Sequence, residues 1–448
     1  MTTEGPVSTV APPIVDQKVN PASDPRQMRR IIAEDPDWSL ATVPLLTDLC
    51  IKNIITCFDE NPTLNELLPK HKTKVLELLS TTIPLKVTAP LVEDEGYWQK
   101  CCKAKWNICD ISKHGNNWKR MFFEKTVEGI IESYIPETTE FTELNDTLAL
   151  GERFIRSLNI NQLLPPVKEI NLKEDDSSDT GSDAGQEGPL LDHFDFGELV
   201  SRTSCLQELH ITYGVSTCGM NFEWNMFQFT SRDCQLLSKA VKACHTLKVF
   251  HLHRSRVDDD KARVLISHLL DHPSLTTLDF SHNKIGDSGA RAIGKLMNGR
   301  CQLAHINLLD NKIKSHGGRA IAHALGKNTT LRTMNMRLNR LGDDGGQAMC
   351  KALAKNTTLV ELNLGSNDLG EPTAAALAQV LVSNKTLRSL IISCNKMGED
   401  GGKSLQEGME ENETVKIMDL RLTEVGQENE YCINQLLKRN NEQDKTAV

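Results

Sequence analysis

One pattern of eleven residues returns along this chain at a constant interval of 28 residues. Each well-formed copy has apolar residues at its first, fourth, sixth and eleventh positions and an asparagine at its ninth. The first positions of these copies are Leu275, Leu303, Leu331, Leu359 and Leu387, and weaker copies begin at Leu247 and Val415. An accidental asparagine would not recur in register. The sequence therefore predicts an array of similar structural units that stack on one another.

The repeated pattern is the leucine-rich-repeat frame. Alternate apolar residues in each copy predict a short strand with one buried face. Small residues follow, and then apolar residues with helical spacing, such as Ile321, Ala322 and Leu325. We expect an α/β fold: a solenoid of the ribonuclease-inhibitor-like 28-residue type, preceded by a small, mainly helical domain. Strands should line the concave face and helices the convex face.

The asparagine at the ninth position is polar although it follows a buried strand. The chain bends away there, and the bend leaves backbone N–H and C=O groups without a strand partner. A buried, unpaired backbone group costs about 1–3 kcal/mol. An amide offers both donors and an acceptor, so a column of amides can pair these groups from coil to coil. We expect a structural ladder, rather than helix caps or a ligand site, from Asn283, Asn311, Asn339, Asn367 and Asn395.

Composition and periodicity divide the chain into five segments. They predict a disordered leader at 1–26, a mainly helical domain at 27–168, an acidic flexible linker at 169–192, the leucine-rich-repeat domain at 193–435 and a polar tail at 436–448.

Two of these segments contain further signals, a helical apolar face in the helical domain and an imperfect first copy in the repeat domain. Helical spacing within the helical domain predicts one apolar helix face, formed by Leu46, Leu49, Cys50, Ile54, Cys57 and Phe58. An imperfect first repeat begins at Leu206, 41 residues before Leu247, and we assign the 13 extra residues to the aromatic-rich stretch 218–233.

The composition excludes several classes of function. A net charge of −9 argues against bulk nucleic-acid binding. No apolar run reaches the ~18 residues of a membrane span, and the amino terminus lacks the features of a secretory signal. The 13 cysteines are therefore expected to be free thiols in a reducing compartment such as the cytoplasm. Glycosylation sequons also recur at the repeat interval, and we interpret them as turn chemistry; they are Asn328, Asn356, Asn384 and Asn412.

Two stretches resemble chemical motifs without completing them. GEDGGKS at 398–404 has Met397 where a phosphate-binding loop needs its first glycine. CCKAKWNICDISKH at 101–114 lacks the short paired spacing of a structural zinc site, so we expect thiols buried on an amphipathic helix, with metal binding by Cys102, Cys109 and His114 as the alternative. No catalytic set or cofactor fingerprint is found. We expect no enzyme activity, no cofactor, no metal and no small-molecule substrate.

Two surfaces are candidates for binding a protein partner. The concave strand positions carry a mixed polar set that suits a broad protein surface. It comprises His251, His253, Arg254, Asp279, His305, Asn335, Arg337, Glu361, Asn363, Asp419 and Arg421. In the helical domain, aromatic and basic residues alternate, which indicates either a core with lysines reaching to solvent or a docking surface. The docking candidates are Trp98, Trp106, Trp118, Lys119 and Arg120.

Four stretches outside the regular repeats closely resemble the family of dynein regulatory complex subunit five. They read RRIIAEDPDWSLATVPLLTDLCIKNI, HGNNWKRMFFEK, CGMNFEWNMFQFTSRDC and ACHTLKVFHLHRSRVDDDKAR. The resemblance extends from about residue 29 to about residue 435. It implies a non-catalytic subunit of the nexin–dynein regulatory complex in the axoneme of cilia and flagella, part of the cytoskeleton. The implied partners are other subunits of that complex and the doublet microtubule assembly.

Two other classes remain as alternatives. The repeat subtype also resembles the GTPase-activating protein for the nuclear-transport GTPase Ran, which would make the chain a catalytic accessory. The stretch VPLLTDLCIKNIITCFDENPTLNELLPKHKTKVLELL loosely resembles the helical leader of leucine-rich-repeat ubiquitin-ligase substrate receptors. A stimulated-hydrolysis assay and copurification with a cullin adaptor would distinguish these alternatives from a scaffold.

Overall fold

The computed structural model describes residues 28–30, 42–166, 192–216, 218–220 and 224–446. The predicted leader at 1–26 and nearly all of the predicted acidic linker lie outside these residues. The chain divides into two compact units, Met1–Asn107 and Ile108–Val448, and each has its own buried core.

The first unit contains a short antiparallel strand pair and helices. Its elements are β1 (Met28–Arg30), β2 (Thr42–Pro44), α1 (Leu46–Thr56), α2 (Pro69–Leu78), α3 (Leu85–Leu91) and α4 (Glu95–Lys105). Aromatic residues of α4 form part of the core. Trp98 is 1% exposed, and its indole N–H donates to the carbonyl oxygen of Val92 at 2.8 Å. A buried indole needs such an acceptor, so this bond fixes the orientation of the ring.

Helix α1 buries its predicted apolar face only in part, because Phe58, just after the helix, is fully buried, whereas Cys50 is exposed. It packs against α2 and buries Ile51, whereas Leu46 is 74% exposed and Leu49 is 42% exposed. Leu46 and Ile51 are five residues apart, which places them about 140° from each other around the helix. The prediction failed at the start of α1 because periodicity alone does not show which part of a helix its neighbour covers.

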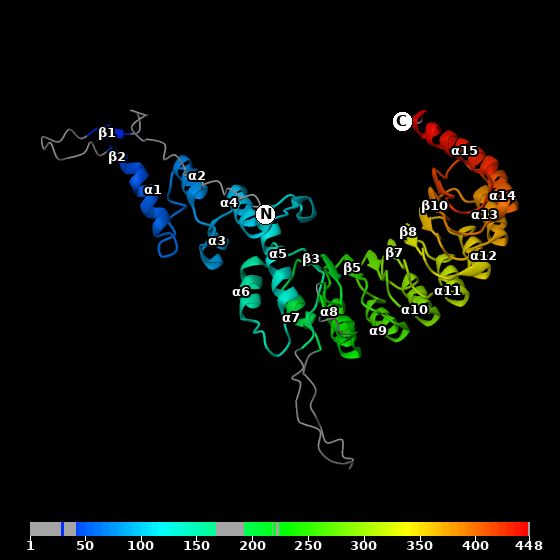
Figure 1. Cartoon of the computed structure of the whole chain (residues 1–448), viewed down its shortest axis with the longest axis horizontal. Helices are drawn as coiled ribbons and strands as arrows, with labels where there is room; N and C mark the ends of the chain where they lie inside the picture. Colours follow the sequence, from blue (N-terminus) through cyan, green and yellow to red (C-terminus); the bar gives the residue numbers. More distant parts are fainter. Residues whose placement is uncertain (1–27, 31–41, 167–191, 217, 221–223, 447–448) are drawn as a thin grey trace, which may run out of the picture. The chain divides into compact units, whose positions relative to one another are not determined.

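Within the described residues, the second unit is built on a parallel sheet of nine strands, whose order in the sheet follows their order in the chain (Figure 1). The strands are β3 (Ser157–Ile160), β4 (Glu208–Ile211), β5 (Val249–Leu252), β6 (Thr277–Asp279), β7 (His305–Asn307), β8 (Thr333–Asn335), β9 (Glu361–Asn363), β10 (Ser389–Ile391) and β11 (Ile417–Asp419). Leu278 pairs with Ile306, and Ile306 with Met334, so the pairing repeats the 28-residue interval.

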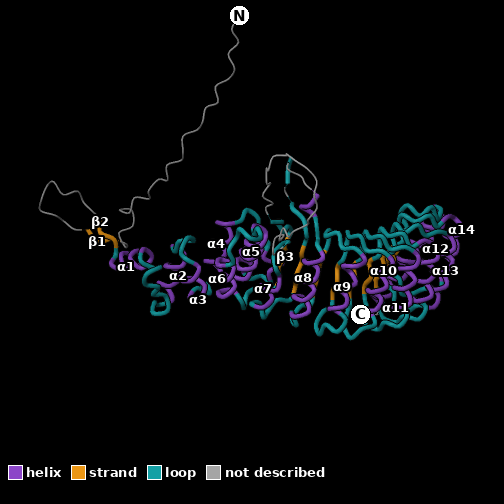
Figure 2. The backbone as a smooth tube through the Cα atoms, turned by 90° about the horizontal axis from the view of Figure 1, so that it is seen from below, coloured by secondary structure: helices purple, strands orange, loops and turns teal. Residues whose placement is uncertain are grey.

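Helices accompany these strands along the solenoid, and from α8 onward they cover one side of the sheet (Figures 1 and 2). They are α5 (Trp118–Ser133), α6 (Thr142–Gly151), α7 (Phe196–Ser201), α8 (Ser231–Ala243), α9 (Asp259–Leu269), α10 (Asp287–Met297), α11 (Ser315–Leu325), α12 (Gly342–Leu353), α13 (Glu371–Ser383), α14 (Gly398–Glu410) and α15 (Gln427–Thr446). From α8 to α15, each helix packs against the next. The predicted leucine-rich-repeat solenoid is confirmed.

The core lies between the strands and the helices. Alternate residues such as Leu278 in β6 and Phe280 directly after it are fully buried. Helix contacts are close enough to require glycine at some positions. A β-carbon on Gly402 would collide with the carbonyl oxygen of Val425 in the next coil. The glycine pair that resembles a phosphate loop therefore lies inside α14, where Gly401 faces Ala374 of α13 and Gly402 faces the loop before α15.

The first strand of the sheet lies within the segment that was predicted to be a helical domain. β3 pairs with β4, which places Leu158 beside Leu209. Helix α5 packs along the outer edge of β3, where a further strand would otherwise pair. Three α5 carboxylates at four-residue intervals accept backbone N–H groups there: Glu124 from Ser157 at 2.7 Å, Glu128 from Asn159 at 2.7 Å and Glu132 from Asn161 at 2.7 Å.

The structure also relocates two predicted boundaries. The division after Asn107 falls inside the predicted helical domain at 27–168, because α5 and β3 contact each other and β3 belongs to the repeat sheet. The predicted linker at 169–192 consequently connects two paired strands of one sheet. The predicted tail at 436–448 is helical as far as Thr446, since α15 buries Leu437 and Asn440 against the last coil.

Candidate partner-binding surface

The predicted asparagine column lies buried in the bends that follow the strands. Its five members are 0–8% exposed and all make backbone contacts. Asn339 shows the pattern: its side-chain N–H₂ donates to the carbonyl oxygens of Leu308 at 2.9 Å and Met336 at 3.0 Å. Its side-chain oxygen accepts from the N–H of Ile313 at 3.1 Å. Each amide thus joins its own coil to the preceding one.

A second asparagine column lies at the turn that precedes each strand. Its members are Asn328, Asn356, Asn384 and Asn412, all at most 7% exposed, and Asn440 within α15 occupies the equivalent position after the last strand. Asn356 donates to the carbonyl oxygens of Leu325 at 2.9 Å and Asn328 at 3.0 Å and accepts from the N–H of Leu359 at 2.8 Å. The 28-residue recurrence of the sequons was the signal for this column, and its amide nitrogens are occupied by hydrogen bonds.

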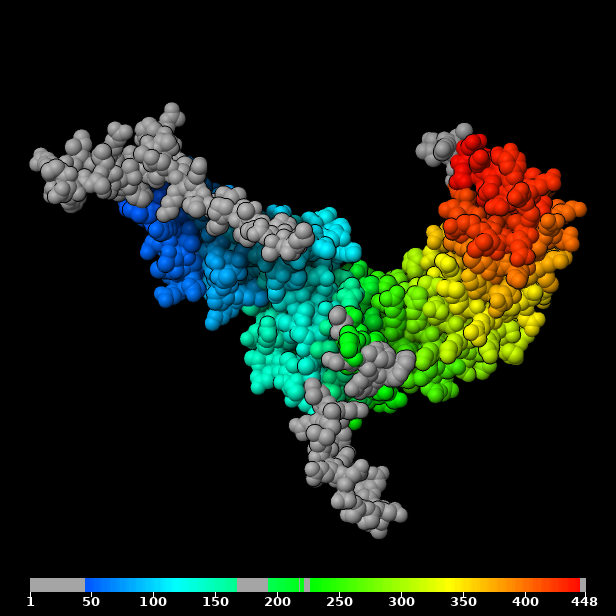
Figure 3. All heavy atoms as spheres, viewed as in Figure 1, coloured from blue at the N-terminus to red at the C-terminus, as the bar shows by residue number. Residues whose placement is uncertain are grey.

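Polar side chains on the open side of the strands surround a hollow of about 340 Å³. Six of the predicted concave residues line it: His251, Asp279, His305, Asn335, Glu361 and Asn363. Hydrogen bonds hold some of its polar groups in place, as between Asp279 and Asn307 at 2.7 Å and between His305 and Thr333 at 2.7 Å. In the space-filling view the repeats curve around this side of the solenoid (Figure 3).

Three histidines lie at the amino-terminal end of this surface. The rings of His210 and His251 are 4.1 Å apart, edge to face. Burial, followed by the neighbouring His251 and His253, lowers the pKa of His210 to about 4. Burial also lowers the pKa of His251 and of His253. These rings are therefore neutral at pH 7. The sequence prediction missed His210 because it belongs to the imperfect first repeat.

The other predicted concave residues lie beyond the hollow. His253 contacts the hydroxyl of Thr212 at 3.2 Å, while Arg254 and Arg337 are exposed. Arg421 donates two hydrogen bonds of 2.8 Å to Asp419. These bonds hold the pKa of Asp419 at about 2. Arg254 and Arg337 are consequently the exposed cations that this set offers to a partner.

Two of the five predicted docking residues are buried. Trp98 and Lys119 are each 1% exposed, and the Lys119 ammonium lies 4.7 Å from the ring centre of Phe154. They belong to the cores of the two units, which removes them from a docking role. Trp106, Trp118 and Arg120 are partly exposed. Trp98 and Trp106 lie in the first unit, and the other three lie in the second.

The cysteine–histidine stretch at 101–114 is also divided between the two units. Cys102 is buried in the first unit, whereas His114 lies in the second and contacts the buried Glu124 at 2.5 Å. Among the described residues, no group of three or more histidine, cysteine, aspartate or glutamate side chains is arranged to hold a metal ion. None of the described helices has the length and apolarity needed to cross a membrane.

The strand, the amide columns and the helix of each coil define a leucine-rich-repeat fold. The family model described as Leucine Rich repeat matches residues 271–294, 327–350, 355–378 and 383–405. Among curated proteins, the chain is 52% identical over 279 residues to Dynein regulatory complex subunit 5 of Macaca fascicularis. It is 51% identical over 285 residues to the protein of the same name from Homo sapiens.

These alignments cover part of each protein. They include 62% and 63% of this chain and 56% and 57% of the two relatives, so the chain spans about half the length of the curated relatives it matches. A more distant relative with the same name, from Chlamydomonas reinhardtii, is 32% identical over 219 residues, which is 49% of this chain and 50% of that protein. The resemblance predicted from the four sequence stretches is confirmed.

Proposed function

We propose that this protein is a non-catalytic scaffold subunit of the axonemal nexin–dynein regulatory complex. The observation that carries the proposal is its identity of 49–52% to mammalian proteins named as a subunit of a dynein regulatory complex. In this role the protein helps to link outer doublet microtubules and to regulate inner-arm dynein, so that cilia and flagella beat. Its partners are other subunits of the complex.

The solenoid suits such a role mechanically. Each coil contacts mainly its neighbours, so a long surface is built from one repeated contact. Both amide columns add hydrogen bonds between coils, as from Asn339 to Leu308 and from Asn356 to Leu325. A coil cannot separate from its neighbour without exposing these buried polar groups, which makes separation costly. A linker that transmits force between motors needs this resistance.

The chemistry of the buried thiols also favours a scaffold over an enzyme. Burial raises the pKa of Cys350 to about 12 and that of Cys301 to about 11. Only the thiolate is an effective nucleophile, so both groups are inert at pH 7. The hollow on the strand side is open and polar and draws residues from several strands. Such a surface is suited to recognising a protein.

A rescue experiment in ciliated cells tests the proposal. Cells without the protein receive the wild type, the variant Arg254→Glu with Arg337→Glu, or the matched control Arg300→Glu with Lys403→Glu. The control residues are exposed but lie away from the strand surface. Arg421 is left unchanged because Asp419 already pairs with it. High-speed imaging measures bend amplitude and waveform, and electron microscopy measures cilium length.

We expect null cells to assemble cilia of near-normal length that bend with reduced amplitude. The wild type and the control should restore the beat, while the strand-surface variant should not. Normal beating in the null cells would exclude the proposed role. Full rescue by the strand-surface variant would leave the role intact and place the partner surface elsewhere on the protein.

A further inference from the structure

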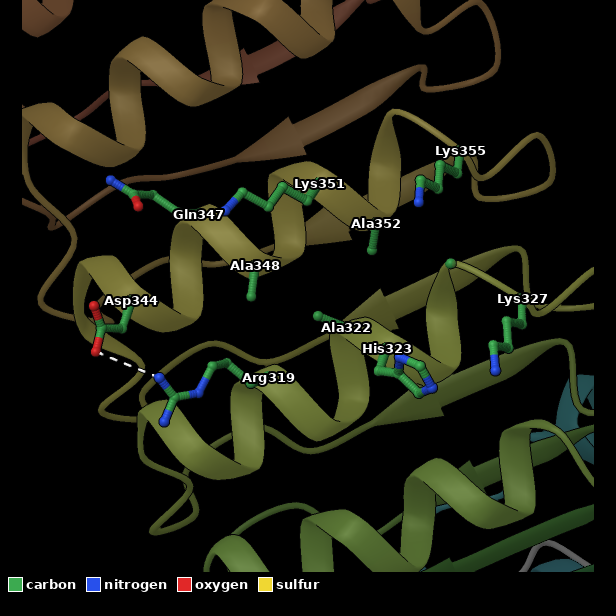
Figure 4. Close-up of a pocket in the computed structure, with 11 residues that line it drawn as sticks. Arg319, Ala322, His323, Lys327, Asp344, Gln347, Ala348, Lys351, Ala352 and Lys355 are labelled. Atoms are coloured by element: carbon green, nitrogen blue, oxygen red, sulfur yellow. Dashed lines mark ion pairs between the residues drawn. The ribbon is translucent and has the colours of Figure 1, made fainter.

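A hollow of about 520 Å³ lies on the helical face, between α11 and α12 (Figure 4). It is separate from the strand surface, since all its lining residues belong to these two helices or directly follow them. Small side chains of Ala322, Ala348 and Ala352 lie between the helices and form its floor. A floor of alanines leaves room for a polypeptide backbone to approach the solenoid closely.

Long polar side chains line the two sides of this groove. On α11 and just beyond it, Arg319, His323 and Lys327 follow one another at four-residue intervals. On α12 and just beyond it, Gln347, Lys351 and Lys355 do the same. Residues four apart lie on the same side of a helix. The groove is therefore bordered by two parallel rows, and Lys327 and Lys355 stand at the same end of it (Figure 4).

The charge in the groove is unbalanced. Arg319, Lys327, Lys351 and Lys355 are cationic, and Asp344 is the acidic residue among the described lining residues. Asp344 lies 3.7 Å from Arg319, and both side chains are largely exposed, so this pair contributes little to stability. Lys327 and Lys355 lie at the end of the groove away from Asp344, and Lys351 belongs to the row on α12. This positive groove occurs in a chain whose net charge is −9.

A second groove on the same face repeats this character. It lies between α9 and α10, has a volume of about 310 Å³, and contains Arg263, Arg291 and Lys295. Basic residues near a helix carboxyl end also favour the helix dipole. The dipole does not explain the pattern alone, because α14 carries Glu407 and Glu410 near its own carboxyl end. The positive charge is thus a property of the α9–α12 part of the solenoid.

We propose that the α11/α12 groove binds an acidic polypeptide segment of a partner protein. The segment lies extended along the groove, and its carboxylates contact Lys327, Lys351 and Lys355. Successive side chains on one side of an extended chain are about 6.6 Å apart, and successive residues of each row are about 6 Å apart along the helix. The spacing allows alternate acidic residues to meet successive members of a row.

The groove is better suited to a peptide than to other polyanions. Its lining residues include no aromatic ring on which a base could stack, apart from the imidazole of His323. They also include no large apolar side chain that could enter the acyl region of a membrane. Separate lysine charges above an alanine floor match separate carboxylates on a narrow backbone. This surface is distinct from the strand surface invoked for the scaffold role.

Fluorescence anisotropy on the purified full chain tests this assignment. The probe is a fluorescein-labelled decapeptide of alternating glutamate and serine, and the matched peptide has glutamine in place of glutamate. Lys327→Glu, Lys351→Glu and Lys355→Glu are combined in one variant. The control variant combines Lys284→Glu, Lys312→Glu and Lys396→Glu, which make the same charge change at exposed positions outside the groove. Circular dichroism verifies that both variants are folded.

We expect the wild type to bind the acidic peptide at least tenfold more tightly than the glutamine peptide, with an affinity that falls as salt is raised. The groove variant should lose at least tenfold in affinity, and the control should remain within twofold of the wild type. Equal losses in both variants, or no binding by the wild type, would overturn the site.

Competition decides the nature of the occupant. Displacement of the peptide by a single-stranded oligonucleotide or by anionic vesicles at lower concentrations than by unlabelled peptide would overturn the peptide assignment. Removal of residues 173–188, the chain's own acidic segment, should leave the affinity unchanged. A tenfold gain on this removal would show that the segment occupies the groove within the same chain and would overturn the assignment to a partner.

Discussion

Asparagine side chains serve two positions in each regular coil, one after the strand and one before it. In both, a primary amide satisfies buried backbone groups that the short strands cannot pair. The first column also shows a local exception. The side-chain oxygen of Asn367 has no hydrogen-bond partner among the described residues. Leu341, which would supply the N–H by analogy with Ile313, has helical backbone angles and leads directly into α12.

Removing one amide from the middle of the first column should destabilise the solenoid. Asn339→Ala deletes the contacts to Leu308, Met336 and Ile313 and leaves buried backbone groups unpaired. We expect the free energy of unfolding in urea to fall by about 1–3 kcal/mol. Asn335→Ala, on the open side of the neighbouring strand, is the control and should cost less. Unchanged stability combined with lost partner binding would contradict a structural role for Asn339.

The half-buried histidines should make the amino-terminal end of the solenoid sensitive to acid. The pKa of His210 is about 4 in the folded protein and 6.5 when unperturbed. Between these values the unfolded chain takes up a proton that the folded chain does not, so stability falls as the pH falls. Since one pKa unit corresponds to about 1.4 kcal/mol, His210 alone should cost up to about 3 kcal/mol at pH 4.

Urea unfolding of the wild type and of His210→Gln at pH 7 and pH 4.5 measures this effect. The loss of stability on acidification should be smaller for the variant, because glutamine does not titrate. His305→Gln, at an exposed position on the same surface, is the control for replacing a histidine by glutamine. An equal loss in the wild type and in His210→Gln would show that His210 is not the acid-sensitive group.

At the scale of elements, α5 closes the sheet where its first strand would otherwise present open backbone groups. Two strand residues span about 6.6 Å and four helical residues about 6 Å, so carboxylates at four-residue intervals can meet alternate N–H groups of β3. Unpaired strand edges invite pairing with other chains. The closure has an electrostatic cost, since burial raises the pKa of Glu128 despite the nearby Lys125.

Of the α5 carboxylates that bind β3, Glu124 should contribute more to the free energy of unfolding than Glu132. Glu124 is fully buried and accepts from Arg120 at 2.8 Å and from the N–H groups of Arg156 and Ser157. Glu124→Ala leaves these groups unpaired and should cost about 3–5 kcal/mol. Glu132→Ala removes a bond at a more exposed position and should cost about 1 kcal/mol.

Hydrogen exchange provides the local readout for these two variants. Glu124→Ala should accelerate exchange of the Ser157 amide, and Glu132→Ala should accelerate exchange of the Asn161 amide, with little change at β8 in either case. Acceleration throughout the solenoid by Glu132→Ala would contradict a local closure.

For the whole molecule, the sequence was most informative where the structure is periodic. The strands, the helices and the column that contains Asn339 could be predicted because the repeat interval places equivalent residues in contact. The contact of Glu124 and Glu128 with β3 could not be predicted, because it occurs once in the fold and follows no repeat. The basic groove was missed for a related reason. Lys327 and Lys355 are 28 residues apart, but their charge matters only because adjacent helices place them along one groove.

The bonds of the amide columns have one more consequence, for how such a protein can change in evolution. They link residues within a coil or in adjacent coils, with sequence separations of at most 31 residues. A duplicated stretch of 28 residues would bring its own strand, helix and amides and leave the closure by α5 untouched. Each duplication would lengthen the sheet by about 5 Å, the spacing between neighbouring strands. The reach of the protein could thus be adjusted in discrete steps, without redesign of either end.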